Sequence, residues 1–360
     1  MKSWDVIIVG AGLIGLSLAI SLRRQGLRVM VIERGEPGRE ASYAAAGMLA
    51  GSGMEIPPAL RALAQASEGS YPEFVRELED ESGMKLDLRD QGTILFSTDG
   101  KFPEKAKMLS ESELHALEPA LASSEASPGQ CSEPACAYLE ERSIDPRALV
   151  TAALKAAKHR SVDISSGNPA RALLISQDRV IGVQTEKSSY SAAAIINCAG
   201  AWAGCLRPYR FPVEPVKGQM LALVGAPSLK HAVRSPEVYL LPRSDGRLII
   251  GSTIEHAGYD KRTDVNVIGQ LFRKATKLVP GVAAAKEHEA WAGLRPGTPD
   301  GLPLLGASTS AGYFVSSGHF RDGILLAPIS AAVITELILC QAPVFDLSAF
   351  SPRRFPSTAN

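Results

Sequence analysis

Residues 4–35, WDVIIVGAGLIGLSLAISLRRQGLRVMVIERG, decide the fold of this chain. Residues 5–9 form a short β-branched run, which is typical of a buried parallel strand. A glycine-rich turn follows, then an Ala- and Leu-rich helical pattern up to Gly26, and a second β run over residues 28–32. This order predicts a complete strand–helix–strand unit.

The spacing of the glycines indicates what the unit binds. Gly10 permits a tight turn, Gly12 lets the backbone approach a pyrophosphate at the helix N-terminus, and Gly15 allows close packing of helix on strand. Glu33 follows Gly15 by 18 residues, at the end of the second strand, where its carboxylate can accept hydrogen bonds from a ribose. We therefore predict dinucleotide binding rather than a glycine-rich turn of an unrelated α/β protein. The fingerprint alone leaves NAD and FAD open, and its remaining predicted contacts are Leu13, Ile14 and Arg34.

Length and composition limit the classes of protein. A chain of 360 residues predicts about two domains. Lys plus Arg and Asp plus Glu both number 38, so the formal charge is zero and gives no electrostatic reason to expect nucleic acid or an anionic membrane as a partner. The apolar stretch of residues 6–20 is interrupted by glycines and starts too close to residue 1 for a cationic leader, so we expect neither a signal peptide nor a membrane span.

The cysteines and histidines do not form a metal-binding pattern. The five cysteines are sparse, and the pair Cys131 and Cys136 has no matching second pair or nearby histidine, so we expect no metal and reduced thiols in a cytoplasmic protein. Five of the histidines stand in polar surroundings and are expected at the surface: His115, His159, His231, His256 and His288.

Further stretches follow one another in a recognisable order. They are EASYAAAGMLAG (40–51), ERSIDPRALVTAALKAA (141–157), AAAIINCAGAWAG (192–204), VEPVKGQMLAL (213–223), VYLLPRSDGRLIIGST (238–253), WAGLRPGTPDGLPLLG (291–306) and SSGHFRDGILLAP (316–328). With the N-terminal fingerprint they resemble the flavin-dependent D-amino-acid oxidase superfamily, and most closely its glycine oxidase branch, in which the sequence AAAGML is characteristic. The likeness covers nearly the whole chain.

The resemblance implies an α/β (α+β) fold in which a Rossmann-like FAD-binding domain is interleaved with an antiparallel-sheet substrate domain. The FAD-binding domain would comprise residues 1–50, 136–210 and 291–360, and the substrate-binding domain residues 51–135 and 211–290. The sequence agrees, since residues 85–98, 213–224 and 239–251 alternate like strands, and residues 264–278 have the pattern of an amphipathic helix. Asp145 and Pro146 fit the N-cap and first position of a helix, and residues 121–130 are expected to form a mobile surface loop.

The resemblance also implies which residues meet the substrate. Arg295 matches the arginine that pairs with the substrate carboxylate, and a guanidinium fork suits that planar anion. Tyr239 matches a tyrosine that touches the same carboxylate, and Arg321 lies where the chain passes the flavin edge and can share the anion. Glu237 replaces a histidine of the branch, where it can hold a substrate ammonium or face water, and Ile254 replaces a methionine. Without a role in substrate binding, Arg295 would be an arginine bound by acids at a strand end, and Tyr239 a half-buried tyrosine of a strand.

The implied contacts with FAD, which is expected to be bound non-covalently, come from three further places. Residues 40–51 contribute Ala41, Ser42, Ala46, Gly47 and Met48, and the middle of the chain contributes Ala170 and Gly200. For Met48 the alternative is a side chain that only packs in the core. The C-terminal stretch contributes Gly318, His319, Phe320, Arg321, Asp322, Gly323, Ile324 and Leu325. We expect His319 to contact the flavin through its backbone and not to act as a base. A helix beginning at about Gly323 is expected to direct its N-terminus at the pyrimidine end of the flavin.

The implied reaction is oxidation of a small amino acid, such as glycine, sarcosine or a small D-amino acid, at Cα. The imine hydrolyses to a 2-oxo acid and ammonia or an amine, and oxygen is reduced to hydrogen peroxide. In this family the activity can supply iminoglycine to thiazole (thiamine) biosynthesis. The rivals are a D-amino-acid dehydrogenase with another electron acceptor, an FAD-dependent tRNA-modifying module and a flavoprotein without turnover. The sequence leaves open whether chains associate into a homo-oligomer.

Overall fold

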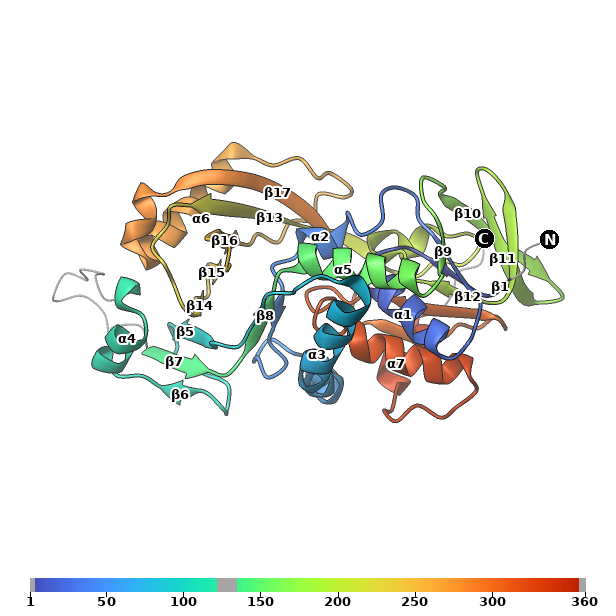
Figure 1. The fold of residues 1–360 in the computed structure, drawn as a ribbon, viewed down its shortest axis with the longest axis horizontal. Helices are drawn as coiled ribbons and strands as arrows, with labels where there is room; N and C mark the ends of the chain where they lie inside the picture. Colours follow the sequence, from blue (N-terminus) through green and yellow to red (C-terminus); the bar gives the residue numbers. More distant parts are fainter. Residues whose placement is uncertain (1–3, 122–134, 356–360) are drawn as a thin grey trace.

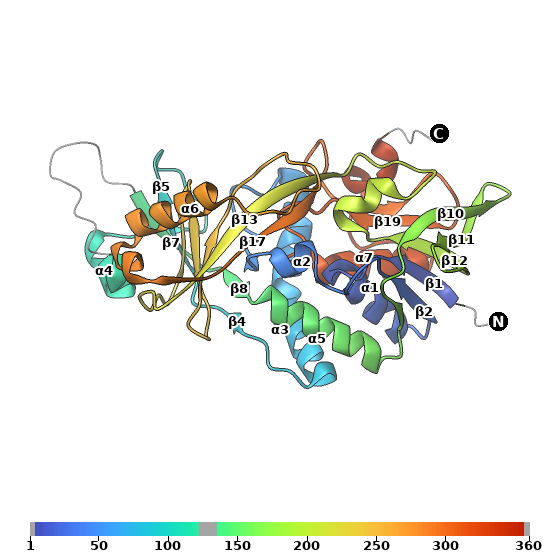
Figure 2. The same ribbon diagram turned by 90° about the horizontal axis from the view of Figure 1, so that it is seen from above.

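The computed structural model describes residues 4–121 and 135–355. Figures 1 and 2 show an elongated molecule with two sheets toward opposite ends of its long axis. The long strands β13 (Glu214–Val224) and β17 (Lys286–Gly297) reach from the second sheet toward the first, as Figure 2 shows. The two sheets are therefore joined by continuous strands and not by a loose linker.

The first sheet contains the predicted strand–helix–strand unit. Its strands run in the order β10–β11–β12–β1–β2–β9, and β19 pairs with β12 and β18. The strands are β1 (Trp4–Val9), β2 (Val29–Ile32), β9 (Asp163–Ser165), β10 (Ala170–Ser176), β11 (Arg179–Thr185), β12 (Ser189–Asn197), β18 (Leu304–Ala307) and β19 (Tyr313–Ser317). These pairs of neighbouring strands are parallel, as expected for a dinucleotide-binding sheet: β1 with β2, β1 with β12, β2 with β9, and β12 with β19.

Strand β1 is buried on both faces, which explains its unbroken apolar run. Val6 and Ile8 belong to the core under the helices, whereas Ile7 and Val9 belong to a second core on the other face, with residues of β10, β11 and β19. Alternate side chains of a strand point to opposite faces, so a strand covered on both sides needs apolar residues throughout.

Helices cover one face of this sheet. They are α1 (Leu13–Arg24), α3 (Arg61–Ser82), α5 (Pro146–His159) and α7 (Ala327–Ile338), whose buried residues share the first core with β1. As predicted, Asp145 caps α5 by accepting hydrogen bonds from the amides of Arg147 (2.9 Å) and Ala148 (3.5 Å), and Pro146 opens the helix.

The second sheet has the strand order β17–β13–β16–β15–β14–β5–β7–β6. Its other strands are β5 (Thr93–Ser97), β6 (Lys107–Met108), β7 (Ala135–Leu139), β14 (Ala232–Arg234), β15 (Tyr239–Pro242) and β16 (Leu248–Gly251). One face, with Leu221 and Ile250, packs on helix α6 (Val265–Leu278), while the other carries Met220 and Tyr239. The alternation predicted for residues 213–224 and 239–251 is thus confirmed, with one face left for a site.

The connecting segments complete the description. A small sheet joins β3 (Met48–Leu49), β8 (Arg142–Ile144) and β4 (Leu88–Arg89), and α2 (Ala41–Ala44) and α4 (Glu111–Leu117) are short helices. Turns of 3-10 helix are η1 (Pro58–Leu60), η2 (Pro119–Leu121), η3 (Gly200–Cys205), η4 (Pro280–Ala284), η5 (Ser348–Phe350) and η6 (Pro352–Arg354). None of the described helices is both long and apolar enough to cross a membrane.

Two expectations are corrected by the fold. The C-terminal helix begins at Ala327 and not near Gly323, because Pro328 suits only the first turn of a helix, where its missing N–H and fixed φ do no harm. His231, expected at the surface, is buried, at 8% exposure. Its ring and backbone nitrogens both lie 3.1 Å from the carboxylate of Glu118, which provides the polar partner that a buried histidine needs. Of the predicted loop 121–130, only Leu121 is among the described residues, and it is buried.

Candidate active site

A large cavity of about 680 Å³ lies where the first sheet meets the second. The cavity is lined by residues from several parts of the chain, among them the N-terminal glycine turn, α2, the second sheet and the C-terminal loop before α7. The predicted cofactor residues on its wall are Gly10, Gly12, Leu13, Ile14, Glu33, Arg34, Ala41, Ser42, Ala46, Gly47, Met48, Ala170, Gly200, His319, Phe320, Arg321, Asp322, Gly323 and Ile324. The tertiary structure therefore gathers segments from almost the whole length of the chain.

Three predicted cofactor residues lie beneath the wall and not on it. A Cβ at Gly15 would collide with the carbonyl oxygen of Gly10, so Gly15 serves the packing of α1 on β1, as predicted. Gly318 has φ +75° and packs against Thr298, and Leu325 is buried in the first core, where its carbonyl accepts a hydrogen bond of 2.6 Å from Ser67 Oγ.

The glycine turn forms a cradle that side chains would fill. Gly10 has φ +109°, and a Cβ there would collide with the carbonyl of Cys198. Helix α1 begins at Leu13, and its N-cap Gly12 offers no side-chain cap, although Ser42 Oγ accepts a 3.0 Å hydrogen bond from the amide of Leu13. This end of α1, with its amide groups and dipole, suits a phosphate.

Glu33 ends β2 at 8% exposure and accepts hydrogen bonds from the amides of Ala11 (2.8 Å) and Gly35 (2.9 Å). Its carboxylate is thus held in one orientation at the cavity wall. Ser316, also on the wall, has a buried hydroxyl without a hydrogen-bond partner within the described residues. A buried hydroxyl without a partner suits a bound ligand with polar groups, because leaving it unpaired is unfavourable.

Beyond Glu33, Arg34 extends the wall. Its guanidinium lies 3.4 Å from the ring centroid of Trp202, and the same side chain forms an ion pair with Glu40. All three residues line the cavity. The predictions included Arg34 but not Trp202, although the stretch that contains Trp202 was recognised.

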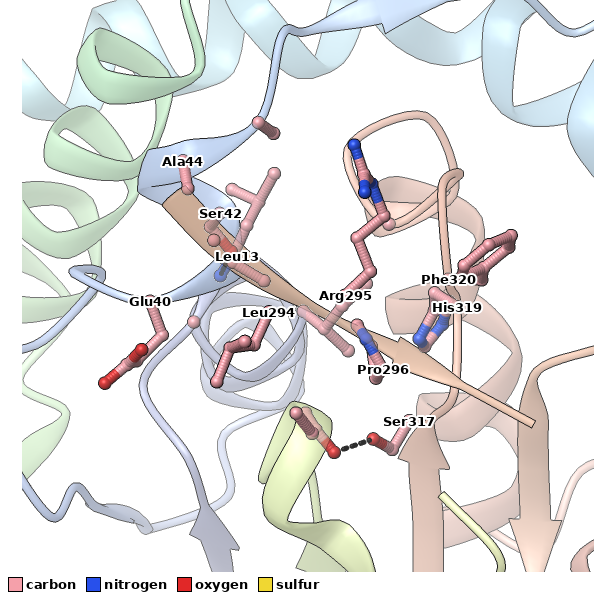
Figure 3. A pocket seen from close by; sticks show the side chains of 18 of the residues that line it. Leu13, Glu40, Ser42, Ala44, Leu294, Arg295, Pro296, Ser317, His319 and Phe320 are labelled. Atoms are coloured by element: carbon pink, nitrogen blue, oxygen red, sulfur yellow. Dashed lines mark hydrogen bonds between the residues drawn. The ribbon is translucent and has the colours of Figure 1, made fainter. Parts of the chain in front are cut away.

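The opposite end of the cavity is built on the second sheet around Arg295. Figure 3 shows this side chain projecting from β17 into the cavity. Arg295 donates hydrogen bonds to the carbonyl of Thr253 (3.1 Å) and to Ser252 Oγ (2.7 Å). Within the described residues no carboxylate lies at salt-bridge distance from it, and burial lowers the pKa of its guanidinium from the ordinary value. An arginine so placed has donors for an anionic ligand.

Tyr239 lies beside Arg295, as predicted. Its hydroxyl donates to Met220 Sδ at 3.2 Å and occupies the space that a Cβ at Gly251 would need. Burial raises the pKa of Tyr239, while the positive charge of Arg295 opposes that rise. The phenol is therefore protonated at neutral pH and available as a hydrogen-bond donor.

Arg321 also lines the cavity, but Nη2 of its guanidinium lies 3.1 Å from the Glu55 carboxylate, and both side chains are partly exposed. Glu237, in contrast, is not on the cavity wall. Its side chain is 61% exposed, and its carboxylate lies 3.7 Å from Lys274 Nζ. This placement fits the alternative that Glu237 faces water, and it corrects the assignment of Glu237 to the residues that meet the substrate. Ile254, at 56% exposure, also lies off the wall.

The ionisable groups of the C-terminal loop are buried. His319 is 3% exposed, its Nε2 lies 2.9 Å from Ser330 Oγ, and burial lowers its pKa to about 3. Burial raises the pKa of Asp322 to about 6, although the neighbouring Arg321 opposes the rise. His319 is thus neutral at physiological pH and engaged with Ser330. Within residues 4–121 and 135–355 no group of three or more His, Cys, Asp or Glu side chains is arranged to hold a metal.

Five charged residues of the wall were not among the predicted contacts: Glu40, Glu55, Arg171, Arg207 and Arg234. Arg234 faces the cavity because it pairs with Tyr239 in the observed register of β14 and β15, and the sequence alone did not establish that register. Glu55 lies in a loop without periodicity, so no sequence signal identifies it.

Comparison with known proteins agrees with this geometry. Residues 5–337 match the DAO family model, described as FAD dependent oxidoreductase. The chain is 35% identical to the bifunctional protein ThiO/ThiG of Synechocystis sp. over 99% of its own length and 55% of that protein, and so spans about half of this relative. It is 34% identical to the glycine oxidase of Pseudomonas aeruginosa, with 96% of this chain and 98% of that one covered.

A solved structure is similar over the whole chain. The crystal structure of glycine oxidase from Geobacillus kaustophilus has a TM-score of 0.91 and 29% sequence identity, covering 99% of this chain and 100% of that one. The glycine cradle, the oriented Glu33 and the unpaired hydroxyl of Ser316 are the features that a bound dinucleotide would need. The chain therefore belongs to the DAO family of FAD-dependent oxidoreductases, and FAD is its cofactor.

Proposed function

We propose that this protein oxidises a small amino acid at Cα, with glycine, sarcosine and small D-amino acids as the substrate class. The observation that carries the proposal is Arg295, a cavity-lining arginine without a carboxylate partner within the described residues. A carboxylate of the substrate would complete its coordination. The similarity to glycine oxidases supports the same class of substrate.

The roles of the residues follow from their positions. Arg295 would bind the carboxylate through both terminal nitrogens, and the Tyr239 hydroxyl would donate a further hydrogen bond to it. Arg321 would add positive charge, although Glu55 must first release it in part. We assign no role to Glu237, because its side chain lies off the cavity wall.

Bound FAD supplies a two-electron acceptor for the hydride that leaves Cα. The nitrogen lone pair of the neutral amine forms the C=N bond, the N–H proton passes to water, and water then releases a 2-oxo acid and ammonia or an amine. Two electrons and two protons reduce oxygen to hydrogen peroxide. His319 is not proposed as the base, since its ring is buried, neutral and bonded to Ser330.

The division of the chain also remains a proposal. Residues 1–50, 136–210 and 291–360 would bind FAD, and residues 51–135 and 211–290 the substrate. The boundaries at 136 and 291 fall inside β7 and β17, and both strands belong to the second sheet. We further propose non-covalent binding of FAD, a cytoplasmic location and supply of the imine to thiazole biosynthesis.

Anaerobic mixing of the holoenzyme with glycine, sarcosine, D-alanine, D-proline and bulky D-amino acids tests the proposal. The small substrates should bleach the flavin band, and bleaching by none of the panel would refute it. Arg295→Ala and Arg321→Ala should raise KM for carboxylate substrates far more than they change flavin content. For Arg295→Ala the loss of charged hydrogen bonds, roughly 2–4 kcal/mol, corresponds to about a 30- to 1,000-fold fall in kcat/KM. Loss of flavin to the same degree would mark these arginines as structural.

The rival functions have their own tests. A dehydrogenase would be reoxidised by oxygen much more slowly than it turns over with an artificial acceptor. A tRNA-modifying module should bind tRNA on filters, which the equal numbers of basic and acidic residues make unfavourable.

A further inference from the structure

We propose that Arg234 selects substrates that carry a second negatively charged group, so that the preferred substrates are amines with two carboxylates. D-aspartate and iminodiacetate represent this class. The inference rests on the proposed function, which it narrows from small amino acids in general to those with a second anion.

Arg234 lies on the same face of the second sheet as Tyr239. It ends β14 and is the register partner of Tyr239 in the antiparallel pair of β14 and β15. Residues directly opposite in such a pair project to the same side. Both side chains accordingly line the cavity, and that of Arg234 is 13% exposed.

Arg234 lies close to the loop of residues 53–55, which Arg321 also contacts through Glu55. The Nη2 of Arg234 lies 3.9 Å from the position that a Cβ at Gly53 would occupy. Gly53 precedes Glu55 by two residues, and Glu55 forms the ion pair with Arg321. The two arginines thus approach the same short loop, one from the sheet and the other from the loop before α7. A substrate held by Arg295 and Tyr239 through its first carboxylate would extend a second one toward Arg234.

The charge of Arg234 is only partly compensated. Its Nη1 lies 3.4 Å from Oε2 of Glu141, which is its one ion-pair partner within the described residues. A guanidinium has five N–H donors, so this long contact leaves most of them available.

The competing explanation is that Arg234 only neutralises Glu141, whose side chain is 2% exposed. Such a role needs the ion pair but no contact with a ligand. The two explanations differ in one measurable respect. A purely structural arginine would affect all substrates equally, whereas a selective one would affect those with a second carboxylate.

Two pairs of substrates isolate the second charge: sarcosine against iminodiacetate, and D-2-aminobutyrate against D-aspartate. For the wild-type holoenzyme we expect kcat/KM to be at least about 10-fold higher for the dicarboxylate of at least one pair. Arg234→Gln should lower kcat/KM about 10- to 100-fold for dicarboxylates and less than about 3-fold for the matched monocarboxylates. Arg234→Lys should restore part of the difference, and Arg262→Gln, an exposed arginine paired with Asp260, serves as the control.

Removal of Arg234 alone leaves Glu141 as a buried unpaired charge, which can unfold the protein. The double variant Arg234→Gln/Glu141→Gln removes both charges and keeps the test valid. Binding without turnover gives an independent measurement: succinate should perturb the flavin spectrum at lower concentration than butyrate, and the double variant should lose this difference. Equal losses for both members of a pair, or no wild-type preference, would overturn the inference and leave the proposed function intact. If no amino acid reduces the flavin, the proposed function is wrong. The comparison of succinate with butyrate then still tests whether Arg234 binds a second carboxylate.

Discussion

The guanidinium of Arg295 occupies the space that a Cβ at Gly218 would need, and Gly218 lies on the neighbouring strand β13. The guanidinium can therefore lie over residue 218 and reach Thr253 and Ser252 only because residue 218 has no side chain. The proposed anion site thus depends as much on this glycine as on the arginine.

Gly218→Ala should accordingly displace Arg295 without touching the FAD cradle. We expect KM for carboxylate substrates to rise roughly 10-fold, the equivalent of about one charged hydrogen bond, while flavin content stays unchanged. Gly69→Ala is the matched control, because Gly69 is exposed within α3 and a Cβ there meets no atom within 4 Å. Alanine at 69 should raise the unfolding free energy by about 0.5–1 kcal/mol and leave the kinetics unchanged. Unaltered KM in Gly218→Ala would contradict this account.

If Arg321 binds the substrate carboxylate as proposed, its ion pair with Glu55 competes with that binding. The ion pair is partly exposed, and such pairs are worth about 0–1 kcal/mol, so Glu55→Gln should lower KM for carboxylate substrates by at most about 5-fold with little change in kcat. Steady-state kinetics at low ionic strength measure the effect. Glu36→Gln, which removes the exposed pair with Arg39, should change neither constant. A rise in KM would instead show that Glu55 helps to hold the substrate.

The buried His319 should make the protein sensitive to acid. Its pKa lies near 3 in the folded state, below the ordinary value of 6.5, so the unfolded chain binds a proton that the folded chain excludes. Stability is therefore present above pH 6.5 and lost as the pH falls from there toward 3. His319→Gln should reduce the loss between pH 7 and 4.5 by about 2 kcal/mol in denaturant titrations. Exposed His256 provides the control, as His256→Gln should leave the pH dependence unaltered.

The buried Glu68 should change the stability of the protein with pH in the opposite direction. Burial and the Glu141 charge raise its pKa from the ordinary 4.5 to about 7, so its contribution to stability is present below pH 4.5 and declines as the pH rises through 7. Glu68→Gln should become progressively more stable than the wild type between pH 5 and 8, as measured by urea midpoints. The exposed Glu73 is the matched control, and a constant difference between Glu68→Gln and wild type across this range would refute the shifted pKa.

The sequence by itself determined the strand–helix–strand unit and its ligand class. Gly10, Gly12, Gly15 and Glu33 act through local spacing, since a turn, a helix start and a strand end are fixed by neighbouring residues. The helix of residues 265–278 and the cap at Asp145 were equally predictable, because periodicity and capping are local as well. The resemblance to a known family added Arg295 and Tyr239.

Only the tertiary structure decided on which side of the second sheet Arg234 and Glu237 lie, and what Arg321 contacts. The turn after β14 is closed by hydrogen bonds of Ser235 with Val238, which leave Glu237 outside the sheet while Arg234 stays in register with Tyr239. Successive residues of a strand point to opposite faces, so a shift of one residue would exchange the two sides. The partnership of Arg321 with Glu55 joins residues 266 positions apart, and no local pattern encodes such a contact. The glycine turn of the cofactor cradle is thus encoded by adjacent residues, whereas the positions of Arg234, Glu237 and Glu55 depend on strand register and long-range packing.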